Sequence, residues 1–327
     1  MTRSLIKRYV TPLLLATGLM AGSAGAAEPF PSRPVTLVAP TTAGGTADLL
    51  SRLLGKQLSE IWGQPVIVEN RPGAGTLIGS DYVARAKPDG YTLMISFTEL
   101  ATLPALNKNA KLDVVKDLDR IGKIGSLPVF VLTNPSVKAQ NMAELIGLMK
   151  ASPGKFTYAS NGQGSALQLY TEVFKRSADV DVLHIPYRGA LEASMAAIAG
   201  EVDLLVQFGS GNVVNHVTAG KLRAYAVASP ERLKRLPDLP TTAEAGLPDL
   251  LLEAWYGMFA PVGIPNEIKE KINRDLNTVL AQPEIIERFA TIGMASEGST
   301  PKEFDTFFIE ENKRWTALIK DAGIESN

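Results

Sequence analysis

The chain has 327 residues, no cysteine, and 33 Lys and Arg against 34 Asp and Glu, which gives a formal net charge of −1. This balance argues against nucleic acid or an anionic membrane surface as the partner. Without cysteine there is no disulfide framework, no thiolate metal site and no lipidated amino terminus, so stability must come from an ordinary hydrophobic core. The length favours two domains over one.

The first segment, Met1–Ala27, has the features of a secretory signal peptide. Basic residues precede an apolar run, Tyr9–Met20, that ends in a stretch of small residues. The apolar run is well short of the roughly 20 residues that a membrane-spanning helix needs, so an uncleaved anchor is the less favoured alternative. We therefore expect a cleaved chain that is exported to the periplasm.

Short β-rich runs and amphipathic helical runs alternate after the signal peptide. Val35–Ala39 is followed by apolar residues at helical spacing up to Trp62, and then by a second β-rich run, Val66–Glu69. Further strands are expected at Tyr91–Phe97, Phe156–Ser160, Val182–Ile185 and Asp203–Phe208, with helices from Leu167 to Phe174 and Leu191 to Ala199. The alternation is typical of βαβ units, so we predict an α/β fold with a parallel sheet covered by helices.

Two β-rich segments, Val129–Leu132 and Leu222–Ala228, lack a short helical crossover and bracket the middle of the chain. We interpret them as the two crossings between domains. Residues 1–27 are then the signal peptide, residues 28–127 and 229–327 form domain 1, and residues 128–228 form domain 2. The last part of the chain supports this division because it is mostly helical, with helices expected at Asn266–Leu280, Glu284–Ile292 and Pro301–Ala322.

The glycine-containing loop Ala39–Asp48, between the first strand and the first helix, is a candidate anion site. Its glycines allow backbone N–H groups to converge at a helix N-terminus, where the helix dipole favours negative charge. The loop lacks the lysine of a phosphate-binding loop and the third glycine of a dinucleotide fingerprint, so a carboxylate fits better than a nucleotide. Asp48 can contact the ligand directly or, as the favoured alternative, brace the loop.

A second glycine loop, Asn161–Ser165, follows the expected strand Phe156–Ser160 in the same way. One such loop in each domain would face the other across a cleft. Each loop alone is a weak signal, because glycines before helices are often simple turns. Arg188, which follows the strand at residues 182–185, is a third candidate: it can pair with a carboxylate or hold an interdomain ion pair, and arginine suits both roles.

Catalytic and metal-binding groups are scarce in the sequence. The chain has two histidines, His184 and His216, and no Gly-x-Ser-x-Gly motif. It has no His-x-x-x-His motif and no acidic loop with metal-binding spacing. His184 lies in an apolar strand and is expected to be a satisfied core residue. We therefore expect no enzymatic activity, no metal site and no cofactor.

Nine segments, in order along the mature chain, carry a resemblance to a known family. They are Pro31-Ser-Arg-Pro-Val-Thr36, the loop Pro40–Asp48, Val68-Glu-Asn-Arg-Pro-Gly-Ala-Gly75, Lys87-Pro-Asp-Gly-Tyr-Thr-Leu93, Tyr158-Ala-Ser-Asn-Gly-Gln-Gly-Ser165, Pro186-Tyr-Arg-Gly189, Gly220-Lys-Leu-Arg-Ala224, Leu239-Pro-Thr-Thr-Ala-Glu-Ala-Gly246 and Trp255-Tyr-Gly-Met-Phe-Ala-Pro261. These segments are similar to those of the solute-binding receptors of the tripartite tricarboxylate transport systems, often called Bug receptors.

The resemblance implies a two-domain periplasmic binding protein fold of the Venus flytrap kind, with a ligand cleft between the domains. It implies a small carboxylate as ligand (a di- or tricarboxylate, an acidic amino acid or an aromatic carboxylate), delivered to the membrane permease subunits of the transporter. By position, the cleft would be lined by Thr41, Thr42, Ala43 and Gly44 from domain 1, by Ser160, Asn161, Gly164 and Ser165 from domain 2, and by Gln207 near its floor. We expect a monomer.

The chain departs from the common family pattern at five positions at or near the expected cleft: Thr41, Thr42, Gln168, Arg188 and Gln207. Two added hydroxyls and a longer amide can accept a more polar ligand or bind an extra water, so the identity of the carboxylate is left open. A ligand-sensing receptor for a membrane sensor kinase is the alternative function, because it would use the same closed surface. A periplasmic hydrolase is disfavoured by the missing nucleophile and base pair.

Overall fold

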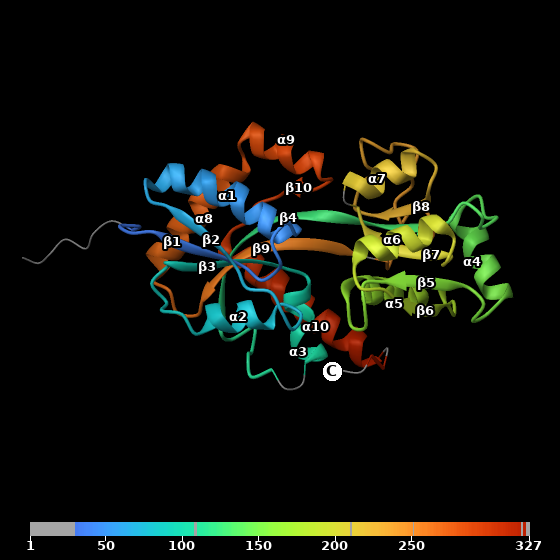
Figure 1. Cartoon of the computed structure of the whole chain (residues 1–327), viewed down its shortest axis with the longest axis horizontal. Coiled ribbons are helices and arrows are strands. Elements are labelled where there is room, and N and C mark those ends of the chain that lie inside the picture. The colour runs from blue at the N-terminus through green and yellow to red at the C-terminus, as the bar shows by residue number, and fades with distance from the viewer. Residues whose placement is uncertain (1–29, 108–109, 210, 251, 322, 325–327) are drawn as a thin grey trace, which may run out of the picture.

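The computed structural model describes residues 30–107, 110–209, 211–250, 252–321 and 323–324. The expected signal peptide lies outside these residues and stays a prediction. The chain forms two lobes (Figure 1), which we call the terminal lobe, built from both ends of the described chain, and the central lobe, built from its middle. Of the helices that the structure describes, none combines the length and apolar composition needed to cross a bilayer.

The sheet of the terminal lobe is parallel on one side and antiparallel on the other. β1 (Val35–Ala39) lies between β2 (Val66–Asn70) and β3 (Thr92–Phe97), and these three strands are parallel. β3 pairs antiparallel with β9 (Glu253–Pro261), which pairs antiparallel with the first part of β4 (Leu118–Thr133). The other elements are α1 (Thr46–Trp62), α2 (Leu77–Ala84), α3 (Glu99–Leu106), α8 (Asn266–Leu280), α9 (Pro283–Thr291), β10 (Ala295–Ser296) and α10 (Pro301–Asp321).

The central lobe repeats the parallel arrangement on a smaller scale. The parallel strands are β6 (Leu183–Pro186), β5 (Thr157–Ser160) and β7 (Leu204–Phe208), in that spatial order. The last part of β4 pairs antiparallel with β7 on one side and with β8 (Arg223–Ala228) on the other. The helices of this lobe are α4 (Met142–Ala151), α5 (Ala166–Ala178), α6 (Ala190–Ala199) and α7 (Gly211–Thr218).

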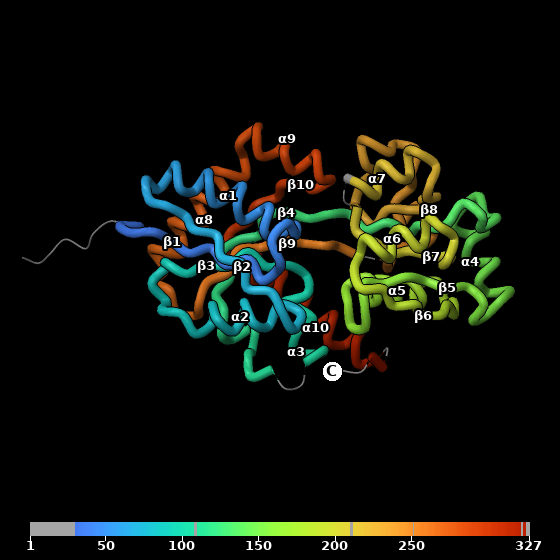
Figure 2. Tube along the Cα trace, in the orientation of Figure 1, coloured from blue at the N-terminus to red at the C-terminus, as the bar shows by residue number. Residues whose placement is uncertain are grey.

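Three elements connect the lobes. β4 passes from one sheet into the other without a break, and β9 runs beside it (Figure 2). α10 reaches the central lobe, where Trp315 lies 5.9 Å from the ring of Tyr170 on α5, and Asp321 pairs with Arg176 at 3.6 Å. The lobes are therefore joined by two paired strands and by side-chain contacts of one helix.

The α/β fold and its parallel strands confirm the sequence prediction, but the sheet is mixed rather than parallel throughout. The antiparallel pair formed by β9 and the first part of β4 was not predicted. β9 is buried on both faces, so its sequence does not alternate. The early part of β4 contains charged residues and the glycines Gly122 and Gly125, where the pairing register shifts, and this irregularity hides the strand pattern.

The boundary between the domains stays a prediction, and the contacts favour moving one of its two crossings. The first crossing, expected near Leu127, falls within β4. Among the described strands, β8 pairs with the central-lobe part of β4, and after β8 the backbone N–H of Thr242 donates to the Val227 carbonyl at 2.9 Å. We therefore propose that the second crossing lies at the start of β9, near Glu253, rather than near Ser229.

The packing core of the terminal lobe is an aromatic cluster between β9 and α10. Trp255, Phe259, Phe304 and Phe308 are each 1% exposed or less, and the ring of Phe304 lies 5.9 Å from Trp255 and 5.2 Å from Phe259. A Cβ at Gly257 would lie 2.1 Å from Phe304 Cζ, so β9 needs a glycine there for α10 to approach.

Replacing Phe304 with alanine tests this packing. The substitution removes a buried ring between β9 and α10 and should lower the free energy of unfolding by about 3–5 kcal/mol. Phe307, a partly buried neighbour on the same helix, is the matched control, and F307A should cost less than half as much. Urea unfolding followed by tryptophan fluorescence measures both; equal losses would contradict the assigned core.

Candidate functional site

The first glycine loop is held by a hydrogen bond to its own helix. Gly44 has a φ of +86°, a left-handed conformation that favours glycine, and its backbone N–H donates to Asp48 Oδ2 at 2.9 Å. The backbone N–H of Gly45, the N-cap of α1, donates to the Thr42 carbonyl at 3.2 Å. Thr42 and Ala43 are left exposed at the tip of the loop.

Asp48 braces this loop rather than pointing into a cleft. It is 2% exposed, and its carboxylate also accepts hydrogen bonds from Arg52 and from Asn70 Nδ2, the latter at 2.9 Å. Asn70 Nδ2 in turn donates to the Thr41 carbonyl at 3.2 Å. The bond from Arg52, with those from Gly44 and Asn70, lowers the pKa of Asp48 to about 2. The brace is the alternative that the sequence analysis favoured.

The second glycine loop has the same construction. Gly164 has a φ of +72°, and its backbone N–H donates at 2.6 Å to Gln168 Oε1, again four residues further on. The N-cap Ser165 donates its backbone N–H to the Gly162 carbonyl at 3.3 Å, as Gly45 does to Thr42. The two N-cap residues also share their backbone angles, with φ −70° and ψ 160° at Gly45 and φ −74° and ψ 161° at Ser165.

Both loops present hydrogen-bonding groups that have no partner in the described parts of the chain. Among the described residues, nothing accepts from the backbone N–H of Thr46 or Ala47 in the first turn of α1, or from that of Ala166 in the first turn of α5. Thr41 Oγ1 and Asn161 Oδ1, one in each loop, are buried and also without a partner in the described chain. Buried polar atoms are nearly always hydrogen-bonded, so these groups point to a bound ligand or water.

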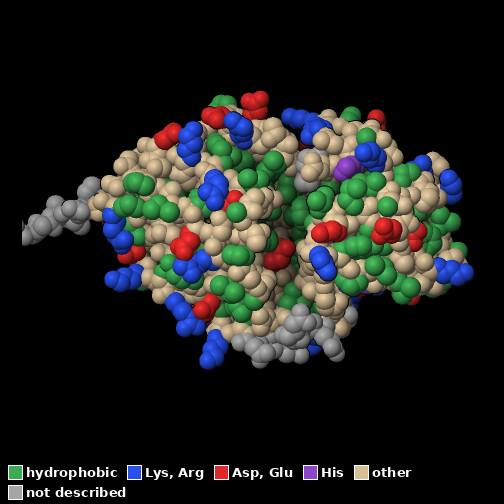
Figure 3. All heavy atoms as spheres, viewed as in Figure 1, with side chains coloured by type: hydrophobic (Ala, Val, Ile, Leu, Met, Phe, Trp, Pro, Cys, Tyr) green, Lys and Arg blue, Asp and Glu red, His purple; other side chains and the backbone are tan. Residues whose placement is uncertain are grey.

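The second loop lies where the lobes meet. A Cβ at Gly164 would be 3.3 Å from Leu106 Cδ2, at the end of α3 in the terminal lobe. The molecular surface is hollowed along the boundary between the lobes (Figure 3). The loop therefore reaches the interlobe boundary, as a ligand site between the lobes requires.

Two other predicted site residues have different surroundings. Gln207, at the end of β7, is 4% exposed, and its Oε1 accepts a hydrogen bond from Ser194 Oγ at 2.8 Å. Arg188, after β6, is exposed and makes no ion pair with any described residue. The interdomain ion pair considered for Arg188 is therefore not formed within the described chain, and its guanidinium remains accessible.

Ser160 and His184 form a pair that sequence reasoning missed. Ser160 Oγ lies 2.6 Å from His184 Nε2, and the imidazole stacks on Tyr158 with 4.9 Å between ring centroids. Burial lowers the pKa of His184. Ser160 is 0% exposed and its hydroxyl also bonds Gly162, so it holds the loop and cannot reach a substrate. The pairing could have been anticipated from the parallel neighbours β5 and β6, which carry the two residues.

Glu99 is a second residue that sequence reasoning missed. It opens α3 directly after β3, at the carboxyl end of a strand beside β1, and its side chain is half-buried. Burial raises the pKa of Glu99 to about 7. Its position directly after a predicted strand could have identified Glu99 as a candidate, because ligands of α/β folds bind at the carboxyl ends of parallel strands.

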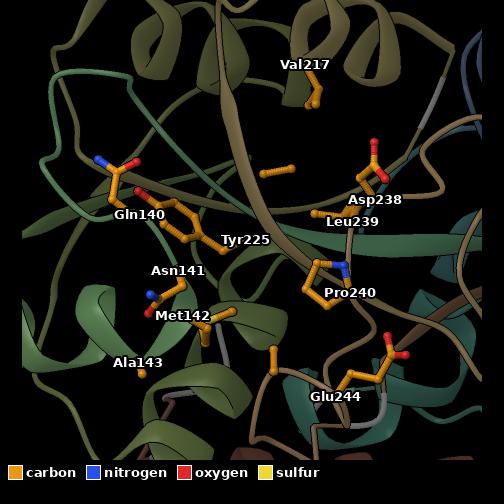
Figure 4. A pocket seen from close by; sticks show the side chains of 12 residues that line it. Gln140, Asn141, Met142, Ala143, Val217, Tyr225, Asp238, Leu239, Pro240 and Glu244 are labelled. Atoms are coloured by element: carbon orange, nitrogen blue, oxygen red, sulfur yellow. The ribbon is translucent and has the colours of Figure 1, made fainter.

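A cavity of about 550 Å³ lies away from the glycine loops, on the central lobe (Figure 4). The start of α4, β8 and the turn at residues 238–245 line it, with Tyr225 and Met142 among its apolar walls. It holds none of the predicted site residues. Groups of three or more His, Cys, Asp or Glu side chains able to hold a metal are absent from the described part of the chain.

Comparison with known proteins gives consistent matches. Residues 50–324 match the family model "Tripartite tricarboxylate transporter family receptor". Protein BugT of Bordetella pertussis is 33% identical over 321 residues, covering 96% of this chain and 98% of BugT. The structure of MatC from Rhodopseudomonas palustris with bound malate is 30% identical, with a TM-score of 0.75 over 89% of this chain and 100% of MatC. That of R. palustris Rpa4515 with adipate is 31% identical, with a TM-score of 0.79 over 91% of this chain and 100% of that protein.

The brace at Asp48 predicts a pH-dependent contribution to stability. Its folded pKa of about 2 lies below the unfolded value of 3.8, so the stabilisation is complete above pH 5 and is lost as the pH falls toward 2. At pH 7, D48N should lower the free energy of unfolding by about 2 kcal/mol. Urea unfolding of D48N and wild type between pH 7 and pH 3 measures the difference; a gap that stays constant over this range would contradict the brace.

Proposed function

The chain belongs to the receptor family of the tripartite tricarboxylate transporters, and from this premise we propose that it captures a small carboxylate between its lobes. The family assignment confirms the resemblance found in the sequence. The fold is the two-lobe α/β fold of periplasmic binding proteins, shared with MatC and Rpa4515. We propose that the protein acts in the periplasm and delivers its ligand to the membrane permease subunits of such a transporter.

One observation carries the carboxylate proposal: in each lobe a parallel strand ends in a braced glycine loop, and the following helix offers backbone N–H groups that have no partner among the described residues. A helix N-terminus favours a negative charge through both its free donors and its dipole. The relatives MatC and Rpa4515 carry malate and adipate, which are small dicarboxylates. We propose Thr41, Thr42, Ala43, Asn161 and Ser165 as the residues nearest to the ligand.

The mechanism that we propose is closure of the lobes on the ligand. A ligand shifts the balance between open and closed forms only if it binds one of them better, so it must contact both lobes. The first turns of α1 and α5 provide one set of donors on each side. The paired strands β4 and β9 cross the boundary and are the elements that must bend.

We propose that the protein is a receptor without enzymatic activity. The matching family model describes receptors, and the structures of MatC and Rpa4515 contain malate and adipate. The Ser160 and His184 pair does not argue for hydrolysis, because Ser160 is fully buried and no carboxylate of a described residue forms a hydrogen bond with the histidine.

Ligand-induced stabilisation tests the proposed function. Malate and adipate serve as probes, and a probe at about 100 times its Kd should add about 2.7 kcal/mol, which raises Tm by several degrees. Ala43 is exposed at the tip of the first loop, so A43E should abolish the shift by placing a competing carboxylate at the start of α1. The matched control is A143E, an exposed alanine in the first turn of α4, which should keep the shift.

Small-angle scattering of the wild type with a stabilising probe should show a smaller radius of gyration than without it. A stabilising probe that leaves the radius unchanged contradicts closure. An undiminished shift in A43E contradicts the assigned loop, and the absence of a shift with malate, adipate and other carboxylates contradicts the ligand class.

A further inference from the structure

Glu99 lies among groups that belong to both lobes. On the terminal lobe, the hydroxyl of Tyr256 on β9 lies beside the side chain of Thr46, the first residue of α1. From the central lobe, Tyr170 on α5 reaches the same region, and its hydroxyl donates to the Glu253 carbonyl at 3.4 Å. Burial, and then the charge of Glu99, raise the pKa of both tyrosines. Glu99 therefore follows β3 at the edge of the sheet where the glycine loop after β1 also begins, and it is close to Tyr170 of the central lobe.

Among the residues that the structure describes, no cation pairs with this carboxyl group. Glu99 makes no ion pair within the described chain, and it opens a helix whose next residues, from Leu100 to Leu103, are buried. The charge of Glu311 on α10 also raises the pKa of Tyr170. Glu311 itself pairs with Arg314 at 2.7 Å and accepts hydrogen bonds from Trp255 and Trp315. The nearby tyrosines do not titrate near neutral pH, because the pKa of each is raised.

Desolvation of a half-buried carboxylate without a counter-charge costs free energy, and closure of the lobes would remove more of the water around it. A ligand can relieve this cost only by bringing a positive charge or by leaving Glu99 protonated. The first turns of α1 and α5 already supply donors for a ligand carboxylate. Glu99 offers the complementary group for a cation on the same ligand.

We propose that Glu99 is a specificity-determining residue, which selects a carboxylate that also carries a protonated amino group, such as an amino acid. This inference rests on the proposed function of the cleft. The ligand carboxylate binds the helix N-termini, and its ammonium group pairs with Glu99. Such a charge-assisted pair gains strength in a cleft from which water is excluded. A dicarboxylate without an amino group brings only negative charge toward Glu99 and binds less well.

Two matched pairs of probes, which differ only by an amino group, test the proposal: L-aspartate with succinate, and L-glutamate with glutarate. At pH 8, isothermal titration calorimetry of the wild type should show at least tenfold tighter binding of the amino-bearing member of one pair. E99Q keeps the size of the side chain but cannot become charged, so this preference should disappear. E99D keeps the charge and should retain part of the preference.

The pH dependence gives a second readout. Because burial places the pKa of Glu99 at about 7, its carboxylate is available above that pH and is lost below it. The preference for the amino-bearing probe should therefore fall as the pH decreases from 8 to 5.5 in the wild type, and should stay flat in E99Q. Burial lowers the pKa of His184, and this imidazole is present in both proteins, so a pH effect that it causes should appear in E99Q as well as in the wild type.

The outcomes separate the two proposals. If succinate and glutarate each bind as tightly as their amino-bearing counterparts, or if E99Q keeps the preference, the role of Glu99 is wrong and the carboxylate site stands. If none of the probes binds, with malate and adipate included, the proposed function fails and the inference fails with it. A tenfold preference that is lost in E99Q and declines toward low pH supports the assignment.

Discussion

The site depends on one repeated interaction, the hydrogen bond from a loop glycine N–H to a side-chain acceptor four residues further on. Gly44 donates to Asp48 in the terminal lobe, and Gly164 donates to Gln168 in the central lobe. Each bond fixes a left-handed glycine against the first turn of a helix, and among the described residues the first N–H groups of that turn have no acceptor. The lobes differ in sequence at the acceptor but share the geometry.

This bond also decides which donors a ligand can use. The N–H of Gly44 is already occupied by the protein's own carboxylate, so the groups that remain are those of the helical turn and the exposed loop tip. A site of this kind attracts negative charge without a lysine or arginine in contact, because the dipole and the backbone provide the attraction. Such a site binds a carboxylate but does not discriminate between ligands by their other groups, so selectivity must come from the surrounding side chains.

Local patterns in the sequence were enough to predict both loops. Contacts between distant segments could not be predicted from such patterns. The strand, glycine and helix pattern around Gly44 and Gly164 is contained within a few residues, so it is visible before the chain folds. β9 and the first part of β4 become strands by pairing with each other across more than a hundred residues, and Ser160 meets His184 only because β5 and β6 are neighbours. The same holds for Glu99, whose neighbours come from β9 and α5.

The two carboxyl groups on the terminal-lobe side of the site differ in a way that bears on selectivity. Asp48 has Arg52, Asn70 and a backbone N–H as partners, and its pKa falls to about 2. Glu99 pairs with no cation in the described part of the chain, and its pKa rises to about 7. A cleft evolved only for anions gains nothing from an acid that lacks a counter-charge, since each anion that binds raises the cost of ionising it. That Glu99 forms no ion pair with any described residue therefore has a functional explanation if the ligand itself supplies the missing positive charge.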